Sequence, residues 1–160
     1  DITSGIDSTY DEYMFVMTDI GPASDSVDFS IQFNAASQSG FNETITSTVF
    51  RSVHEEDDSP AALAYAAGAD QAQATAYQLI SNATGNGSDE SCAGILHLFN
   101  PASTTYVKHF YCRVSNYGSV NIAEDQFTAG YINVTAAIDE ISFKMSSGNM
   151  DGVIQMYGIA

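Results

Sequence analysis

The sequence has very little positive charge. Its 160 residues include 4 Lys and Arg against 20 Asp and Glu, which gives a formal net charge of −16. So few cations cannot neutralise a row of phosphates, so we expect no nucleic-acid partner and no anionic membrane partner. No apolar run approaches the roughly 20 residues needed to span a bilayer. The N-terminus also lacks the basic and then apolar pattern of a signal peptide.

The motifs of common enzyme classes are missing as well. The sequence contains no G-x-S-x-G, no H-E-x-x-H, no Walker loop and no C-x-x-C. It has no Trp, which weakens the case for a carbohydrate-processing cleft, and its acidic residues single out no catalytic pair of carboxylates. We therefore expect a protein that is not an enzyme, with no catalytic residues and no cofactor other than a possible Ca²⁺ ion.

Alternation of apolar and polar residues is the main pattern that is present. A period of two is typical of half-buried strands, and 44% of the residues are hydrophobic, enough to form a core. The predicted strands cover 13–20, 27–33, 44–53, 75–80, 93–99, 104–114, 127–134, 138–145 and 153–157. We predict an all-β, two-sheet antiparallel β-sandwich, jelly-roll-like, with about eight or nine strands in one domain over 1–160.

Two connections have recognisable turn chemistry, and one segment breaks the β pattern. Residues 100–103, Asn-Pro-Ala-Ser, separate two β-rich runs and predict a hairpin, and residues 146–149, Ser-Ser-Gly-Asn, predict another between the last two strands. The Ala-rich run over 60–73 follows Ser59-Pro60 and breaks the β pattern. It predicts a short helix or a loop inserted between strands.

Acidic residues cluster at 55–58. Glu55, Asp57 and Asp58 could supply oxygen ligands to Ca²⁺, although adjacent carboxylates do not reproduce the alternating pattern of an EF-hand loop. The alternative is a solvated loop without metal.

The predicted hairpin around 102–103 determines where the two cysteines and two of the histidines lie relative to each other. If the chain turns there, Cys92 and Cys112 come near each other, and His97 falls close to opposite His109. A disulfide would close a loop of about 20 residues and stabilise the fold by roughly 3 kcal/mol. A register error of one residue would point the two cysteines to opposite faces, so free buried thiols remain the alternative. The sequence indicates no third ligand that would complete a metal site with the two histidines.

Tyrosines lie near the predicted strand ends. Tyr10, Tyr65, Tyr77 and Tyr117 could stack on sugar rings, which suggests a carbohydrate-binding module as an alternative function. The other interpretation places these rings at a rim or a protein interface.

The most distinctive segment is the last one. Residues 137–143, Ala-Ile-Asp-Glu-Ile-Ser-Phe, are followed by Ser146-Ser-Gly-Asn, and then by Gly-Val-Ile-Gln-Met-Tyr-Gly-Ile over 152–159. This resembles the C-terminal signature of a family of tailed-phage virion structural proteins common in marine phages. The segments 13–25, 30–34 and 94–101, together with Lys108, are similar to the first half and central hairpin of that family.

The resemblance implies a role in a virus particle. Members of this family are β-sandwich domains that decorate the capsid or form head or tail appendages, without known enzymatic activity, so no catalytic residue is transferred. It implies location in the virion, partners among phage capsid or tail proteins, and self-association, with a homotrimer expected because appendages follow the symmetry of their attachment sites. The alternative within the same particle is a fibre domain that binds a receptor or a host-surface glycan.

Overall fold

A computed structural model describes residues 1–160, and its regular structure is entirely β. The ten strands are β1 (Glu12–Pro22), β2 (Val27–Ala35), β3 (Ile45–Glu55), β4 (Ala61–Tyr65), β5 (Gln78–Thr84), β6 (Cys92–Phe99), β7 (Lys108–Gly118), β8 (Ile122–Ile132), β9 (Ile138–Met145) and β10 (Met150–Ile159). All the pairings are antiparallel. The structure has no helix that could cross a membrane.

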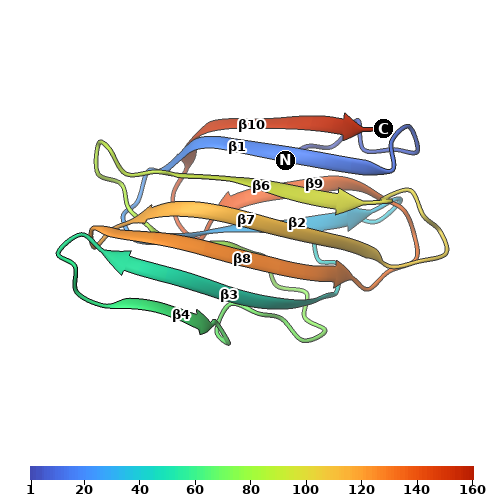
Figure 1. Ribbon diagram of the computed structural model, residues 1–160. Coiled ribbons are helices and arrows are strands. Elements are labelled where there is room, and N and C mark those ends of the chain that lie inside the picture. The colour runs from blue at the N-terminus through green and yellow to red at the C-terminus, as the bar shows by residue number, and fades with distance from the viewer.

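The strands form two layers of unequal width. The large sheet has the order β10-β1-β6-β7-β8-β3-β4, and the small sheet has the order β9-β2-β5 (Figure 1). A single pair, Thr84 with Gly118, joins β5 of the small sheet to β7 of the large one. The predicted antiparallel β-sandwich is confirmed, with ten strands rather than eight or nine.

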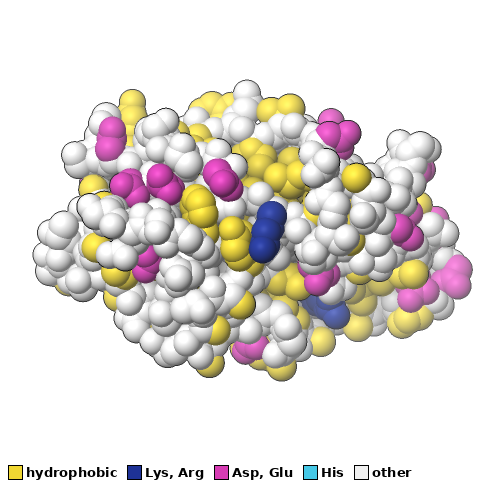
Figure 2. Space-filling view, turned by 180° about the vertical axis from the view of Figure 1, so that it is seen from behind, with side chains coloured by type: hydrophobic (Ala, Val, Ile, Leu, Met, Phe, Trp, Pro, Cys, Tyr) yellow, Lys and Arg dark blue, Asp and Glu magenta, His cyan; other side chains and the backbone are white.

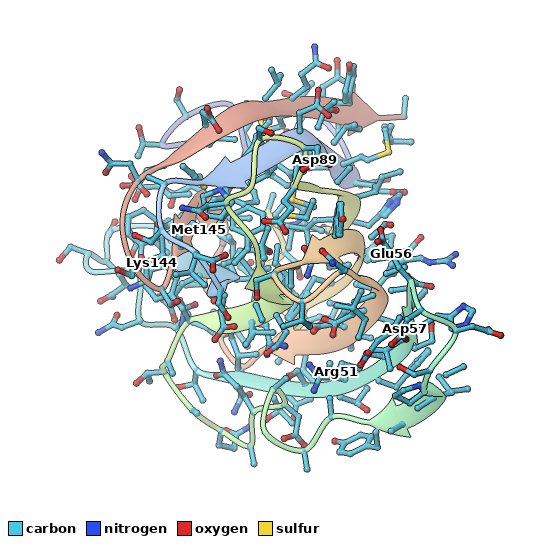
Figure 3. All side chains as sticks on the ribbon, turned by 90° about the vertical axis from the view of Figure 1, so that its left-hand side faces the viewer. Arg51, Glu56, Asp57, Asp89, Lys144 and Met145 are labelled. Atoms are coloured by element: carbon cyan, nitrogen blue, oxygen red, sulfur yellow. The ribbon has the colours of Figure 1, made fainter.

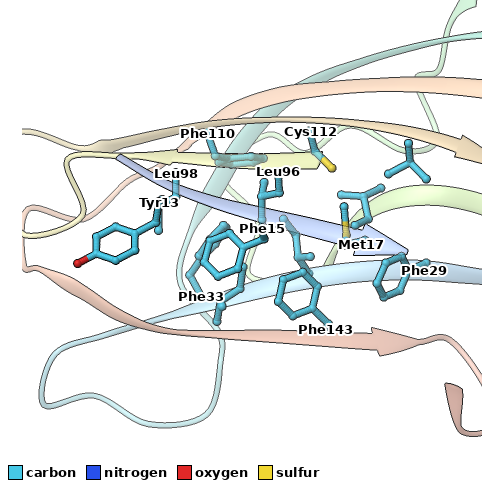
Figure 4. Packing of buried hydrophobic residues seen from close by; sticks show 14 of the residues in the cluster. Tyr13, Phe15, Met17, Phe29, Phe33, Leu96, Leu98, Phe110, Cys112 and Phe143 are labelled. Atoms are coloured by element: carbon cyan, nitrogen blue, oxygen red, sulfur yellow. The ribbon is translucent and has the colours of Figure 1, made fainter. Parts of the chain in front are cut away.

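The core lies between the two layers and follows directly from the alternation in the sequence. Tyr13, Phe15 and Met17 of β1 are buried, as are the alternate residues of β6 and β7. They pack against phenylalanines of β2 and β9 in the opposite layer (Figure 4). The ring centroids of Phe15 and Phe143 are 5.8 Å apart across the layers. Burying large apolar side chains of this kind stabilises the fold by about 1.5–3 kcal/mol each.

Where β3 and β8 continue the large sheet, their inner face carries both polar and apolar side chains. The segment 66–77 runs along β3 and exchanges backbone hydrogen bonds with it at Ile45, Ser47 and Val49. Ser47 accepts a hydrogen bond from the Gln71 backbone N–H at 2.9 Å and donates one to the Gln78 side chain at 2.6 Å. Gln78 and Gln126 are almost completely buried. Buried hydrogen bonds therefore add to the apolar contacts of Ile45 and Val49 in this part of the sandwich.

One local prediction was partly right and one was wrong. The segment 60–73 contains no helix: its first part forms β4, which pairs with β3 while all its residues stay exposed, and residues 66–73 form the loop that was the predicted alternative. Residues 146–149 do not close a hairpin, because β9 pairs with β2 in the small sheet and β10 pairs with β1 in the large one. The turn crosses between layers, and Gly148 with φ +72° supplies the left-handed conformation that it needs.

Candidate functional site

The outer face of the large sheet carries two adjacent rows of mostly apolar side chains. The strand register aligns these side chains across the sheet. The strands that carry most of them lie at the front of Figure 1. The first row consists of Tyr65, Phe50, Phe127, Arg113, Ile95 and Val16, and the second of Ala129, Tyr111, His97, Met14 and Tyr157. We call these side chains the outer rows.

The outer rows are open to solvent. Tyr65 is 57% exposed, Phe50 46%, Tyr157 44%, Ile95 40% and Tyr111 38%. Scattered exposed apolar side chains are normal on a protein surface, but contiguous ones mark a binding surface or an aggregation liability. On the opposite side of the molecule, hydrophobic side chains are interrupted by polar and acidic ones (Figure 2). The outer rows are therefore the strongest candidate for a functional surface.

The aromatic rings of the outer rows stack on one another. The centroids of Phe50 and Phe127 are 5.2 Å apart with planes at 5°, and those of His97 and Tyr111 are 4.6 Å apart with planes at 27°. Phe127 and Tyr111 continue the stack diagonally at 6.3 Å and 13°. The separations of the two directly opposed pairs, 5.2 Å and 4.6 Å, are close to the 4.7–4.9 Å between neighbouring strands. The rings therefore stand upright on the sheet and turn their faces toward each other and their edges toward solvent.

Few charges interrupt this surface, and those that do are paired. The Arg113 guanidinium donates to both carboxylate oxygens of Asp125, at 2.7–3.2 Å. This pairing raises the pKa of Arg113 further above its usual value. The Nδ1–H of His97 donates to the Glu12 carboxylate at the other end of the stack. The Arg113–Asp125 pair costs less to desolvate than two isolated charges, so a partner can cover the middle of this face without leaving Arg113 as a lone ion.

The predicted sugar-binding tyrosines do not form one site. Tyr65 belongs to the outer rows and donates a hydrogen bond to Asp70. Tyr77 donates to Ser142 Oγ at 3.0 Å, and Lys144 Nζ lies 3.7 Å from its ring centroid, so one ring face is occupied. Tyr117 lines a depression at the end of the molecule that holds the acidic loops. Tyr10 packs edge-on against Tyr13 with centroids 5.9 Å apart.

The predicted calcium ligands lie in the loop between β3 and β4. Figure 3 looks at this end of the molecule, where Glu56, Asp57 and Asp89 extend from two loops. Glu55 accepts a hydrogen bond from Ser59 Oγ, Asp57 accepts one from the Ser59 backbone N–H, and Asp58 contacts His54. No group of three or more His, Cys, Asp or Glu side chains is placed to hold one metal ion. Calcium binding at Glu55, Asp57 and Asp58 stays a prediction.

The hairpin between β6 and β7 is present, but its register differs from the predicted one. Its loop spans 100–107, so Cys92 lies opposite Asn116 and Cys112 lies opposite Leu96. Four residues along a strand amount to about 13 Å, beyond the roughly 7 Å that a disulfide can bridge between Cα atoms. Both cysteines are free and buried. His97 lies opposite Tyr111 rather than His109.

Two charged side chains in the interior were not predicted. Lys108 is fully buried at the start of β7, and its ammonium donates to the carbonyls of Ser103, Tyr106 and Val134 at 2.9–3.2 Å. Burial lowers the pKa of Lys108. Glu124 on the inner face of β8 is 6% exposed and pairs with Arg51 Nη1 at 3.3 Å. Burial raises the pKa of Glu124, and the Arg51 charge opposes that rise. Both groups lie in the interior and form no part of an exposed surface.

The side chains that matter most in the outer rows escaped the sequence analysis. Phe50, Tyr111 and Phe127 lie inside strands, where an aromatic residue normally indicates the core. One signal was available: in β7, Tyr111 lies between the buried Phe110 and Cys112, so both faces of that strand carry apolar side chains.

Compared with known proteins, the chain matches no family model, no curated protein and no solved structure.

Proposed function

We propose that this chain is a non-enzymatic structural protein of a tailed-phage virion, attached to other particle proteins through the outer rows. The observation that carries the proposal is the contiguous apolar surface across the large sheet, with Phe50, Phe127 and Tyr111 stacked at its centre. Interface cores are enriched in aromatic residues and depleted in unpaired charge, as this surface is. The resemblance of residues 137–159 to the virion family adds the biological setting.

Ring orientation favours a protein over a carbohydrate as the partner. A sugar stacks on an aromatic ring by lying flat against its face, whereas Phe50 and Phe127 turn their faces to each other at 5°. The outer rows thus present a ridge of ring edges and aliphatic groups. Such a ridge fits between the side chains of another protein, where edge-to-face contacts contribute about 0.5–1.5 kcal/mol each beyond burial. A glycan-binding fibre domain is the outcome that the experiment below must be able to detect.

The test uses particles of the phage that encodes the chain, prepared with the gene deleted. We expect purified protein to bind these particles saturably, with a fixed number of copies per particle. The double variant Phe50→Ser/Tyr111→Ser removes two exposed rings and should weaken binding at least about 30-fold, since a central aromatic anchor contributes 2 kcal/mol or more. Far-UV circular dichroism verifies that the variant is folded.

A matched control removes two exposed hydrophobic side chains away from the outer rows. Tyr106 is 71% exposed in the loop 100–107, and Val120 is 68% exposed in the turn after β7. Tyr106→Ser/Val120→Ser should bind like the wild type. Absence of the protein from gradient-purified wild-type particles contradicts the virion role. Binding to host polysaccharide that the ring variant loses would assign the outer rows to a glycan instead.

A further inference from the structure

Strand β10 forms one edge of the large sheet and leaves half of its backbone groups without a strand partner. It pairs with β1 alone, from Glu12 opposite Ile159 to Thr18 opposite Val153. The edge strand lies at the top of Figure 1 with nothing beside it on the outer side. Unpaired N–H and C=O groups along such an edge are a template for another strand.

The other edges of the sandwich carry the usual protection against strand addition. At the far edge of the large sheet, β4 has only five residues and follows Pro60. At the edge of the small sheet, β9 carries Asp139, Glu140 and Lys144, and Ile2 exchanges two backbone hydrogen bonds with Ile141 there. Short length, charge and coverage all discourage pairing with another chain.

Strand β10 lacks these protective features over most of its length. Residues 152–159 contain no charged residue and no proline, in a chain with net charge −16. Irregularity is confined to the start of the strand, where the register shifts and Gly152 has φ +119°. An added Cβ at Gly152 would lie 2.5 Å from the Asp19 carbonyl oxygen. The open, uncharged part of the edge therefore runs from Val153 to Ile159.

We propose that β10 pairs antiparallel with β10 of a second copy of this chain, about a two-fold axis at Gln155. In this register Val153 lies opposite Tyr157 of the second copy, and Ile154 lies opposite Met156. Aliphatic residues and aromatic residues make favourable cross-strand pairs. Asp151 falls at the end of the ladder, opposite Ile159, so no two carboxylates on β10 face each other. The segment is thus self-complementary, as an interface between identical copies must be.

The alternative registers are less favourable. A shift of the axis by half a residue would place Val153 opposite Met156 in one direction, or Tyr157 opposite Ile154 in the other. Each pair joins an outward-facing residue to an inward-facing one, whereas residues opposite each other in a sheet must lie on the same face. Moving it to Ile154 would bring Asp151 opposite Tyr157 of the second copy and shorten the paired segment. Moving it to Met156 would keep the faces matched, but it would place Gly158 opposite Ile154 and Gln155 opposite Tyr157 of the second copy. The axis at Gln155 instead pairs each large apolar side chain from Val153 to Tyr157 with another one and places the polar Gln155 opposite itself.

Pairing at this edge would also extend the outer rows. Tyr157 is the last member of the second row, adjacent to Met14 on β1. A second copy across the two-fold axis continues the same face of the sheet with its own Tyr157. The inference does not require the virion role, because the edge and the register argue for it in any setting. The charge of −16 on each chain predicts association that strengthens with salt, since repulsion between the copies is then screened.

The experiment measures molar mass against protein concentration by sedimentation equilibrium, in low salt and in about 0.5 M NaCl, where the Debye length is a few ångströms. We expect a dimer that tightens with salt. Gln155→Lys places two like charges at the axis and should weaken the dimer at least tenfold. Leu63→Lys changes the net charge equally on the exposed β4 strand and should leave the dimer intact.

A mixing experiment tests the register itself. Gln155→Glu alone should weaken the dimer as Gln155→Lys does, but a mixture of the two variants should form a dimer with one copy of each. A wild-type chain that stays monomeric in high salt overturns the proposal. A dimer that Gln155→Lys leaves unchanged overturns it too, because the interface then lies elsewhere. A three-fold mass insensitive to Gln155→Lys would support the expected homotrimer and refute the edge pairing.

Discussion

Replacing the buried Lys108 by methionine should destabilise the protein more than any other single change of charge. Its ammonium has three N–H donors, and all three are used, on the carbonyls of Ser103, Tyr106 and Val134. Methionine is of similar length but can donate to none of them. The variant Lys108→Met therefore removes three charge-assisted hydrogen bonds and leaves three carbonyls without their donor.

The magnitude follows from these contacts. A hydrogen bond to a charged group contributes about 1.5–3 kcal/mol, and an orphaned buried acceptor costs about 1–3 kcal/mol. The loop 100–107 carries two of the carbonyls and can turn them toward solvent, which recovers part of the loss. Removing the buried ammonium also removes its own desolvation cost. We therefore expect a decrease of about 3–4 kcal/mol in the free energy of unfolding, a large fraction of the total for a chain of this size.

The assay is urea unfolding followed by far-UV circular dichroism, because the chain has no Trp for fluorescence. Lys144→Met is the matched control: it removes an exposed ammonium that lies over the Tyr77 ring. That contact is worth about 0.5–1 kcal/mol. If Lys108→Met costs less than about 1 kcal/mol, or no more than the control, the three hydrogen bonds do not hold the loop as we argue.

Two further predictions concern the polar interior and the thiols. Burial raises the pKa of Glu124 in the folded state, so the contribution of Glu124 to stability falls as pH rises through that pKa. The variant Glu124→Gln should therefore raise the free energy of unfolding at neutral pH by about 1 kcal/mol and make it less dependent on pH. Urea unfolding at pH 4 and pH 7 measures both effects. Equal or lower stability of the variant at neutral pH would contradict this. Burial raises the pKa of Cys92 to about 11 and raises that of Cys112 further. Neither thiol should react with a disulfide reagent near pH 8 until urea unfolds the protein, and rapid labelling of the folded protein would refute this.

The fold class could be predicted because the alternation in the sequence is strong. Phe29, Ile31 and Phe33 alternate with polar residues and are all buried in the structure. Strand β4 was missed because its Ala-rich sequence has no alternation; it is a strand only because β3 offers it an edge. The crossing at 146–149 was missed because two strands adjacent in sequence need not pair, and turn chemistry alone does not say which layer the chain enters.

The candidate site was harder to predict because it depends on register. An eight-residue loop at 100–107, held by the buried ammonium of Lys108, replaces the tight turn that the sequence suggests. That changes which residues of β6 and β7 lie opposite each other. Until the register is known, Tyr111 and Phe127 cannot be told from core residues, and their stacking cannot be anticipated. Local patterns determine which residues form strands, whereas the surface depends on how strands far apart in sequence align.

The pairing of β1 with β10 and of β2 with β9 has a consequence for synthesis. These ladders join the first thirty-odd residues to the last twenty or so, and contacts so distant in sequence make folding slow. Phe15 and Phe29 cannot reach Phe143, their partner in the core, until that residue has left the ribosome. During translation, the emerging apolar strands are therefore exposed together. The abundance of carboxylates over ammonium groups keeps such a chain dispersed in water, so the acidic composition serves the nascent polypeptide before it serves the folded surface.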